Sequence, residues 1–217
     1  MNDIDLQKLV IEELAFDPRV DSASIAVAGL DGVVTLRGTI RSLTEKWQAI
    51  EDVKSVRGVV GIADELVVEL PAEHLRSDTD IARAVAMRLE SNAMVPEAVR
   101  FVVTRGEVTL SGEVAWNFQR DEAVREVRGV TGVLSIRNQI AIAPAPVPTV
   151  EDVRRRIQSV FARTADSDAN RVRVSVDRST VTLRGKVRSW LEHDIATQAA
   201  WNMRGVTRVE NRLEVGS

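Results

Sequence analysis

A five-residue segment, Val-Thr-Leu-x-Gly, occurs three times in this chain, at residues 34–38, 108–112 and 181–185. The glycines that end the three copies are separated by 74 and then by 73 residues. This spacing is too long for a solenoid repeat and long enough for a small domain, so it predicts three tandem copies of one module. We expect the copies at residues 1–70, 79–143 and 150–217, joined by linkers at 71–78 and 144–149.

Each copy has the same order of sequence patterns. It opens with apolar residues at helical spacing, such as Leu6, Val10 and Leu14. Two alternating strands joined by a short turn follow, then a second helix and a third strand. The crossover from the second strand to the third should be right-handed, which makes those two strands parallel. The predicted fold class is therefore α+β: three tandem α-β-β-α-β modules, each a small three-stranded mixed sheet with two helices on one face.

Two glycines recur in register in every copy. The first ends the Val-Thr-Leu strand, and the second follows the second helix, where a left-handed C-cap stops it. We interpret them as structural glycines rather than as a ligand site. They are Gly38, Gly58, Gly112, Gly132, Gly185 and Gly205.

Other positions recur at fixed offsets. The second helix opens with a capping-box pattern at Ser42 and at Ser189, which the second copy lacks. One alanine per copy should face the sheet, namely Ala49, Ala123 and Ala196. Asp64, Asn138 and Asn211 could offer oxygen atoms to a cation, but such residues more often bond the local backbone, which we favour.

Composition excludes several classes of function. The chain has no cysteine, which rules out disulfides, zinc–thiolate sites and thiol nucleophiles. It shows no signal peptide and no apolar run long enough to cross a bilayer, so we expect a cytoplasmic protein. His74 and His193 occupy non-equivalent places, and no Ser-His-Asp set, metal-spaced cluster or phosphate-cradling loop occurs. We therefore expect a protein that is not an enzyme, and the sequence identifies no metal ligands.

Charge changes along the chain. Residues 1–70 carry 7 basic and 13 acidic side chains, residues 79–143 carry 8 of each, and residues 150–217 carry 13 and 9. The net charges of the copies are thus −6, 0 and +4. This distribution favours an anionic partner on the third copy or head-to-tail self-association, against the alternative of solvated surfaces without a role.

The third copy also supplies the candidate binding site. Strand alternation places five basic residues on one outward face, and a tryptophan follows them, which together suits an interfacial membrane anchor. The candidate residues are Arg171, Arg173, Arg184, Lys186, Arg188 and Trp190. Packing of Trp190 against a neighbouring module is the alternative. Trp47 and Trp201 are expected in the core, and nucleic acid is a less favoured partner because the chain is acidic overall.

The repeated pattern of helix, hairpin, Val-Thr-Leu-x-Gly, helix, Gly-Val and a final aliphatic strand resembles the BON domain family of bacterial osmotically inducible and nodulation proteins. The resemblance implies the same α-β-β-α-β fold and roles in osmotic or envelope stress. It also implies association with phospholipid or membranes, and potassium binding in a cytoplasmic relative. We expect a non-catalytic stress-response protein that binds anionic phospholipid or a membrane-associated assembly. The alternatives are a potassium-responsive module, whose only cofactor would be that cation, and a protein–protein scaffold.

Overall fold

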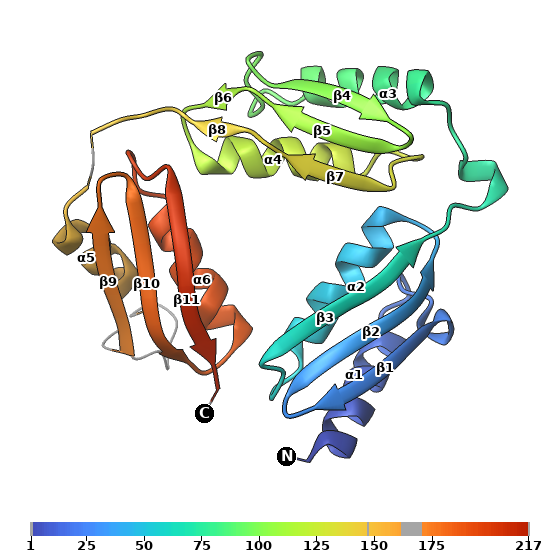
Figure 1. Cartoon of the computed structure of the whole chain (residues 1–217), viewed down its shortest axis with the longest axis horizontal. Coiled ribbons are helices and arrows are strands. Elements are labelled where there is room, and N and C mark those ends of the chain that lie inside the picture. Colours follow the sequence, from blue (N-terminus) through green and yellow to red (C-terminus); the bar gives the residue numbers. More distant parts are fainter. Residues whose placement is uncertain (1, 147, 162–170, 217) are drawn as a thin grey trace. The chain divides into compact units, whose positions relative to one another are not determined.

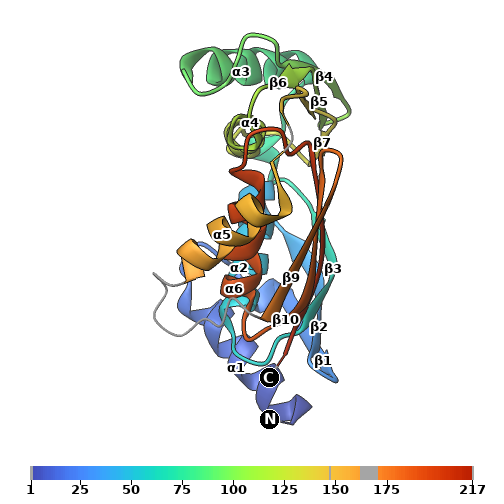
Figure 2. The same ribbon diagram turned by 90° about the vertical axis from the view of Figure 1, so that its left-hand side faces the viewer.

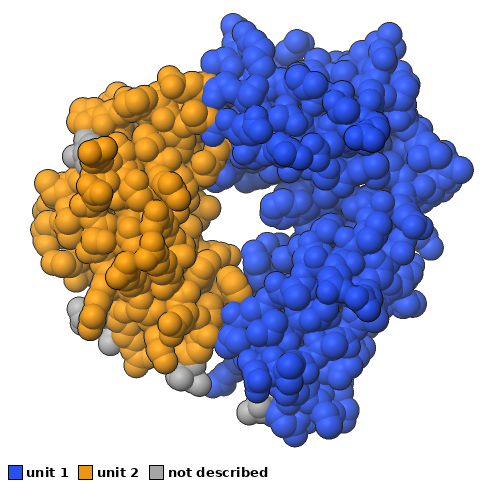
Figure 3. Space-filling model, in the orientation of Figure 1, with its two compact units in different colours: residues 1–112, 121–140 blue, residues 113–120, 141–217 orange. Residues whose placement is uncertain are grey.

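The computed structural model of this chain describes residues 2–146, 148–161 and 171–216 (Figure 1). Val147, in the expected second linker, lies outside the described residues. Residues 1–112 and 121–140 form one compact unit, and residues 113–120 and 141–217 form a second (Figure 3). The division between the two units falls within the second sequence repeat.

The first unit holds the whole first repeat and most of the second. The elements of the first repeat are α1 (Asp3–Phe16), η1 (Ser22–Ser24), β1 (Ile25–Leu30), β2 (Val33–Ile40), α2 (Leu43–Ser55) and β3 (Gly61–Val68). Those of the second repeat in this unit are α3 (Asp78–Ser91), β4 (Arg100–Thr104), β5 (Glu107–Ser111) and β7 (Ser135–Asn138), and η2 (Ala72–His74) lies in the linker before them.

The second unit holds the remaining elements. Helix α4 (Asn117–Arg128) begins in the second unit and ends in the first. The other elements are β6 (Glu113–Val114), β8 (Ala141–Ile142), α5 (Val150–Phe161), β9 (Val172–Asp177), β10 (Thr180–Val187), α6 (Trp190–Trp201) and β11 (Arg208–Val215).

The sheets are mixed, as the sequence predicts. In the first repeat β2 lies between antiparallel β1 and parallel β3. In the third repeat β10 lies between antiparallel β9 and parallel β11. The second repeat has the same order, β4-β5-β7, and the short strands β6 and β8 form a separate parallel pair. The Val-Thr-Leu strand is central in each three-stranded sheet, which confirms the predicted α+β class.

In the first and third repeats, both helices lie on one face of the sheet. Figure 2 shows α1 and α2 on one side of β1–β3, and α5 and α6 on one side of β9–β11. The repeated alanines Ala49, Ala123 and Ala196 have no exposed surface, which confirms that the second helix of each repeat packs at close range. Because apolar side chains alternate along β2 and β10, the opposite face of each sheet is left open.

The hairpin turns follow from local backbone preferences. Strands β1 and β2 are joined by Asp31 and Gly32, and β4 and β5 by Arg105 and Gly106. All four residues have positive φ angles, between 50° and 78°. Two consecutive positive φ angles define a type I′ turn, whose twist matches that of the two strands it joins.

The start of the second helix departs slightly from the expected capping box. The Ser42 hydroxyl accepts from the Glu45 backbone N–H at 3.1 Å, as expected. The Glu45 carboxylate, however, accepts from the N–H of Arg41, one residue before the N-cap, at 2.8 Å. In the second repeat, where no box was expected, the Gln119 amide oxygen accepts from the N–H of Trp116 at 3.0 Å. An amide or carboxylate thus holds the incoming chain in both repeats.

Candidate functional site

Three of the five candidate basic residues, Arg173, Arg184 and Lys186, lie on the open face of the third-repeat sheet, and the other two flank its strands. Arg171 immediately precedes β9, Arg173 belongs to β9, Arg184 and Lys186 belong to β10, and Arg188 follows it. All five are exposed. The residues between them, including Val172, Val181, Leu183 and Val187, are buried against α5 and α6. Strand alternation therefore separates an apolar face from a basic one.

The strand register places three arginines in one row across this face. Arg184 on the central strand lies directly opposite Arg173 on β9 and opposite Arg212 on β11. Sequence reasoning missed Arg212, because strand alternation alone does not reveal which residue of a distant strand lies beside Arg184. The signal was nevertheless available, since Arg212 lies 27 residues after Gly185, as Glu65 lies 27 residues after Gly38.

The acidic residues on this face neutralise only part of its charge. Glu210 on β11 pairs with Arg212 at 2.8 Å and with Arg208 at 3.5 Å. Glu214 lies 4.0 Å from the Lys186 ammonium group. Arg173 and Arg184 form no hydrogen bond or ion pair with any residue that the structure describes. The centre of the face therefore carries two cations without a carboxylate partner.

Trp190 does not share this face. It is the first residue of α6, which belongs to the helical layer on the other side of the sheet (Figure 2). Its ring is half-buried and lies edge-on to His193, with 4.9 Å between the ring centroids. Its neighbour Leu191 is 64% exposed and is the accessible apolar side chain at this helix start.

Of the two tryptophans expected in the core, Trp201 packs against the core of the third repeat, whereas Trp47 lies nearer the surface. Trp47 is 38% exposed, so its expected place in the core is wrong, and the Arg128 guanidinium lies 4.9 Å from its ring centroid. Trp201 is half-buried, and the Arg120 guanidinium lies 4.5 Å from its ring centroid. A guanidinium above a partly exposed ring contributes about 0.5–1 kcal/mol, less than it would at a desolvated site.

The recurring glycines have structural roles, which differ between the two positions. Gly38 and Gly185 lie within β2 and β10 rather than at their ends, with φ angles of 146° and 127°. A Cβ atom at either position would collide with a backbone carbonyl, that of Ser24 or of Arg171. Gly58, Gly132 and Gly205 have φ angles of 99°, 99° and 87°. They do not cap the second helices, as the sequence predicted, because α2 and α6 end at Ser55 and Trp201 with Val56 and Asn202 as their C-caps. The glycines instead supply left-handed backbone in the turn before the third strand.

The repeated Asp or Asn of the third strand bonds the local backbone. Asp64, Asn138 and Asn211 each accept from the N–H two residues later, at 3.1, 3.1 and 2.9 Å. In the first repeat the carboxylate of Asp64 also pairs with the Lys46 ammonium at 2.9 Å, and the same ammonium donates to the Leu66 carbonyl at 2.7 Å. These oxygens accept hydrogen bonds within the fold, as the favoured interpretation of local backbone bonding predicts.

Comparison with known proteins identifies the family. The sequence model of the BON domain matches this chain three times, over residues 2–69, 77–144 and 149–217. The chain belongs to the BON domain family.

A curated relative with BON-like sequence is the osmotically-inducible protein Y of Escherichia coli (strain K12). It is 30% identical over 145 residues, which cover 64% of this chain and 72% of the relative. Among solved structures, two of CdsD, the structural protein of the type III secretion system of Chlamydia trachomatis, align over 98% and 96% of this chain. The two alignments cover 98% and 91% of those structures. The sequence identity is 15% in both, and the TM-scores are 0.28 and 0.25, so these structures carry no functional argument.

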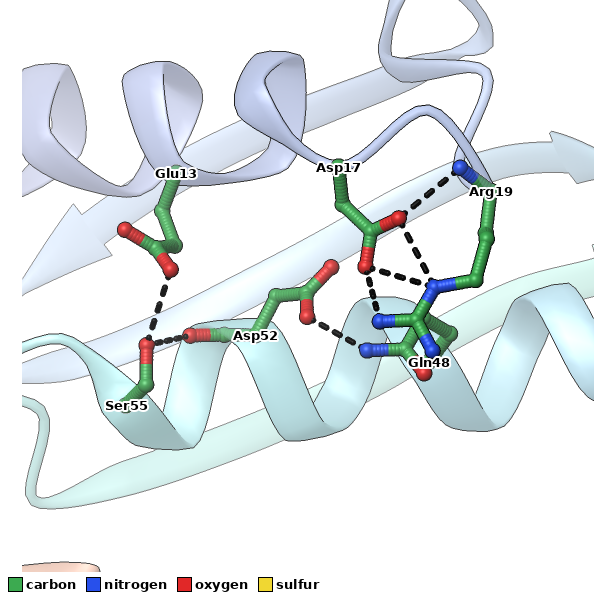
Figure 4. Close-up of polar contacts among 6 residues, drawn as sticks. All are labelled: Glu13, Asp17, Arg19, Gln48, Asp52 and Ser55. Carbon is green, nitrogen blue, oxygen red and sulfur yellow. Dashed lines mark hydrogen bonds and ion pairs between the residues drawn. The ribbon is translucent and has the colours of Figure 1, made fainter.

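The first BON domain holds two buried carboxylates, Glu45 and Asp52. Asp52 on α2 is only 9% exposed, and its Oδ1 accepts from the Gln48 amide at 2.7 Å (Figure 4). Its Oδ2 has no hydrogen-bond partner among the residues that the structure describes. Burial raises the pKa of Asp52 above its ordinary value; the Gln48 bond and the Arg19 charge oppose the rise, and Asp17 and Glu13 add to it.

The groups around Asp52 tie α1 to α2 rather than form a metal centre. Arg19 pairs with Asp17 at 2.6 Å, and its hydrogen bonds lower the pKa of that carboxyl. Ser55 on α2 donates to Glu13 on α1 at 3.2 Å (Figure 4). Among the residues that the structure describes, no group of three or more His, Cys, Asp or Glu side chains could hold a metal ion. In the same residues, no helix is long and apolar enough to cross a membrane.

Proposed function

We propose that this chain is a non-catalytic binding protein of the osmotic-stress response, and that its third BON domain attaches to anionic phospholipid headgroups. Membership of the BON family and the likeness to an osmotically-inducible protein support the general role. The arginine row on the open face of β9–β11 supports the ligand class, because a solvated row of cations attracts an anionic surface.

The first BON domain provides an internal comparison. Its equivalent row is Ala26, Arg37 and Glu65, and the Arg37 guanidinium pairs with Glu65 at 2.7 Å. The same sheet position is thus neutralised in the first domain and positively charged in the third. This contrast is the observation that carries the proposal, since the shared fold by itself assigns no role to any of the three domains.

Vesicle co-sedimentation tests the proposal on the full chain. Binding to phosphatidylcholine vesicles should rise as phosphatidylglycerol is added. It should fall with salt, because the Debye length shortens from about 8 Å at physiological ionic strength to about 3 Å at 1 M. The triple change Arg184→Gln, Lys186→Gln and Arg188→Gln should weaken binding on the order of 100-fold, since each cation contributes about 1 kcal/mol at such a surface.

A matched control lies on the helical side of the same domain. Arg154, Arg155 and Arg156 are exposed on α5, and changing all three to Gln alters the net charge by the same amount. This variant should keep most of the binding. Equal losses in the two triple variants would show that net charge, and not the sheet face, governs attachment, and would overturn the proposal.

Two further proposals are a potassium-responsive module, which the family resemblance suggests, and a head-to-tail scaffold, which the charge distribution suggests. A potassium-responsive module would show a higher melting temperature in potassium than in sodium at equal ionic strength. A scaffold that associates head to tail through its acidic first and basic third domains would show salt-sensitive growth in mass with protein concentration. We place lipid first because the repeated Asp and Asn oxygens are already engaged in the fold, whereas Arg173 and Arg184 are not.

A further inference from the structure

Two pairs of side chains lie next to each other on the open face of β9 and β10. Arg173 lies opposite Arg184, and two residues along each strand Ser175 lies opposite Thr182. Directly opposite residues in an antiparallel pair have Cβ atoms about 4.5–5.5 Å apart, close enough for one small group to touch both. The face therefore presents a pair of guanidinium groups beside a pair of hydroxyl groups.

The arginine pair is unfavourable for the folded domain alone. Like charges directly opposite each other in a sheet repel and destabilise it. The nearest acid across the sheet, Glu210, lies opposite Thr182 but is held by Arg212 and Arg208. In the first BON domain the equivalent repulsion does not arise, because Ala26 takes the place of Arg173. An unneutralised pair of this kind is suited to an anion from outside the chain.

We propose that Arg173 and Arg184 together hold one phosphomonoester group, with the hydroxyls of Ser175 and Thr182 as flanking donors, and that this group is the headgroup of a lipid such as phosphatidate. The inference rests on the function proposed above and narrows it to one headgroup class. A phosphomonoester carries nearly two negative charges at neutral pH, which two guanidinium groups can match, whereas a phosphodiester carries one. These four residues lie on the outward face of a sheet, so a membrane that presents many such groups suits the face better than a free ion.

The test compares two anionic lipids at equal surface charge. Full-length protein is mixed with phosphatidylcholine vesicles that contain either phosphatidate or phosphatidylglycerol, in fractions adjusted to equal electrophoretic mobility. The native chain should bind the phosphatidate vesicles at least about fivefold more tightly, because charge-assisted hydrogen bonds to a dianion exceed simple attraction. Arg184→Gln should abolish that preference.

Lys186→Gln is the matched variant, because Lys186 lies on the same strand and face and loses the same charge. It should weaken binding to both lipids by the same factor and leave the preference intact. If both variants change the preference equally, or if the native chain shows no preference, the phosphomonoester site is overturned while general anionic binding stands. If neither lipid binds, the proposed function fails as well.

Competition with inorganic phosphate distinguishes a lipid headgroup from a free phosphate ion as the ligand. Millimolar phosphate should displace the protein from phosphatidate vesicles only weakly, since a single free ion lacks the multivalency of a membrane. Displacement at micromolar concentrations would show that a soluble phosphate is the ligand and would overturn the assignment to a lipid.

Discussion

The protonation of one carboxyl group, that of Asp52, affects the stability of the structure around it. This group lies at the contact between α1 and α2, it is buried, and one of its oxygens has no partner among the described residues. Burial favours the protonated form, so the folded state holds the proton to a higher pH than the unfolded state does. The stability contributed by this group therefore falls as pH rises through the window above its ordinary pKa of 3.8, and the loss persists at neutral pH.

Asp52→Asn should raise the local stability of α2 at pH 7, by up to about 1 kcal/mol, because the neutral amide is less costly to bury and can donate where Oδ2 has no partner. Amide hydrogen exchange of α2 measures the effect. The gain should shrink as the pH falls towards the ordinary pKa of 3.8, because the native carboxyl takes up its proton on the way. Asp152→Asn is the control of opposite sign, because bonds from Thr149 lower the pKa of Asp152 and stabilise its charged form. A lower stability in Asp52→Asn at pH 7 would contradict this account.

At the scale of single elements, the helices and strands follow the sequence pattern closely. Alternation along residues 172–188 gave the correct inward and outward faces, because a strand with one buried face must alternate. The exposure of Trp47 and the role of Gln119 could not be read in this way. Both depend on which side chain of another element or of the incoming chain lies beside them, and local periodicity carries no such information.

The alanine on the second helix tests this element-level packing. Ala49→Leu should destabilise the first BON domain by about 1–3 kcal/mol, because the added carbons have no space between α2 and the sheet. Ala15→Leu, at an exposed position on α1, is the control and should change stability by less than about 0.5 kcal/mol. Urea denaturation of both variants measures the difference. If Ala49→Leu is tolerated as well as the control, the close helix–sheet contact is not as described.

At the scale of the whole molecule, three copies of one fold carry three different charges. The sequence revealed the copies and their charges, and it placed on one face five basic residues, three of which belong to the strands of that face. It did not reveal that Arg212 completes the row, which depends on the register of β11, or that Trp190 belongs to the helical layer. The division into two compact units is equally invisible in the sequence, since the repeat period predicts three equivalent domains.

The arginine row should work wherever the fold presents it. Starting from the triple Gln variant of the third domain, Ala26→Arg with Glu65→Arg gives the first domain the same row around Arg37. Vesicle co-sedimentation should then recover at least about tenfold in affinity, at about 1 kcal/mol per added cation. Ala26→Gln with Glu65→Gln removes the acid without adding a cation and should recover much less. No recovery with the arginines would mean that the third domain contributes more than this row.

The hydrogen bonds around Asp64 affect whether the edge of this small sheet can pair with a strand of another sheet. Strand β3 is the outer strand of its sheet, and the Glu69 N–H donates inward to Ile40. Alternation then directs the peptide groups of Leu66 outward, where Asp64 covers the N–H and Lys46 covers the carbonyl. A foreign strand would find both groups already occupied. The repeated Asp or Asn thus disfavours the addition of another strand at this edge. This matters in a chain with three small sheets, because each exposed edge strand is a possible site of aggregation.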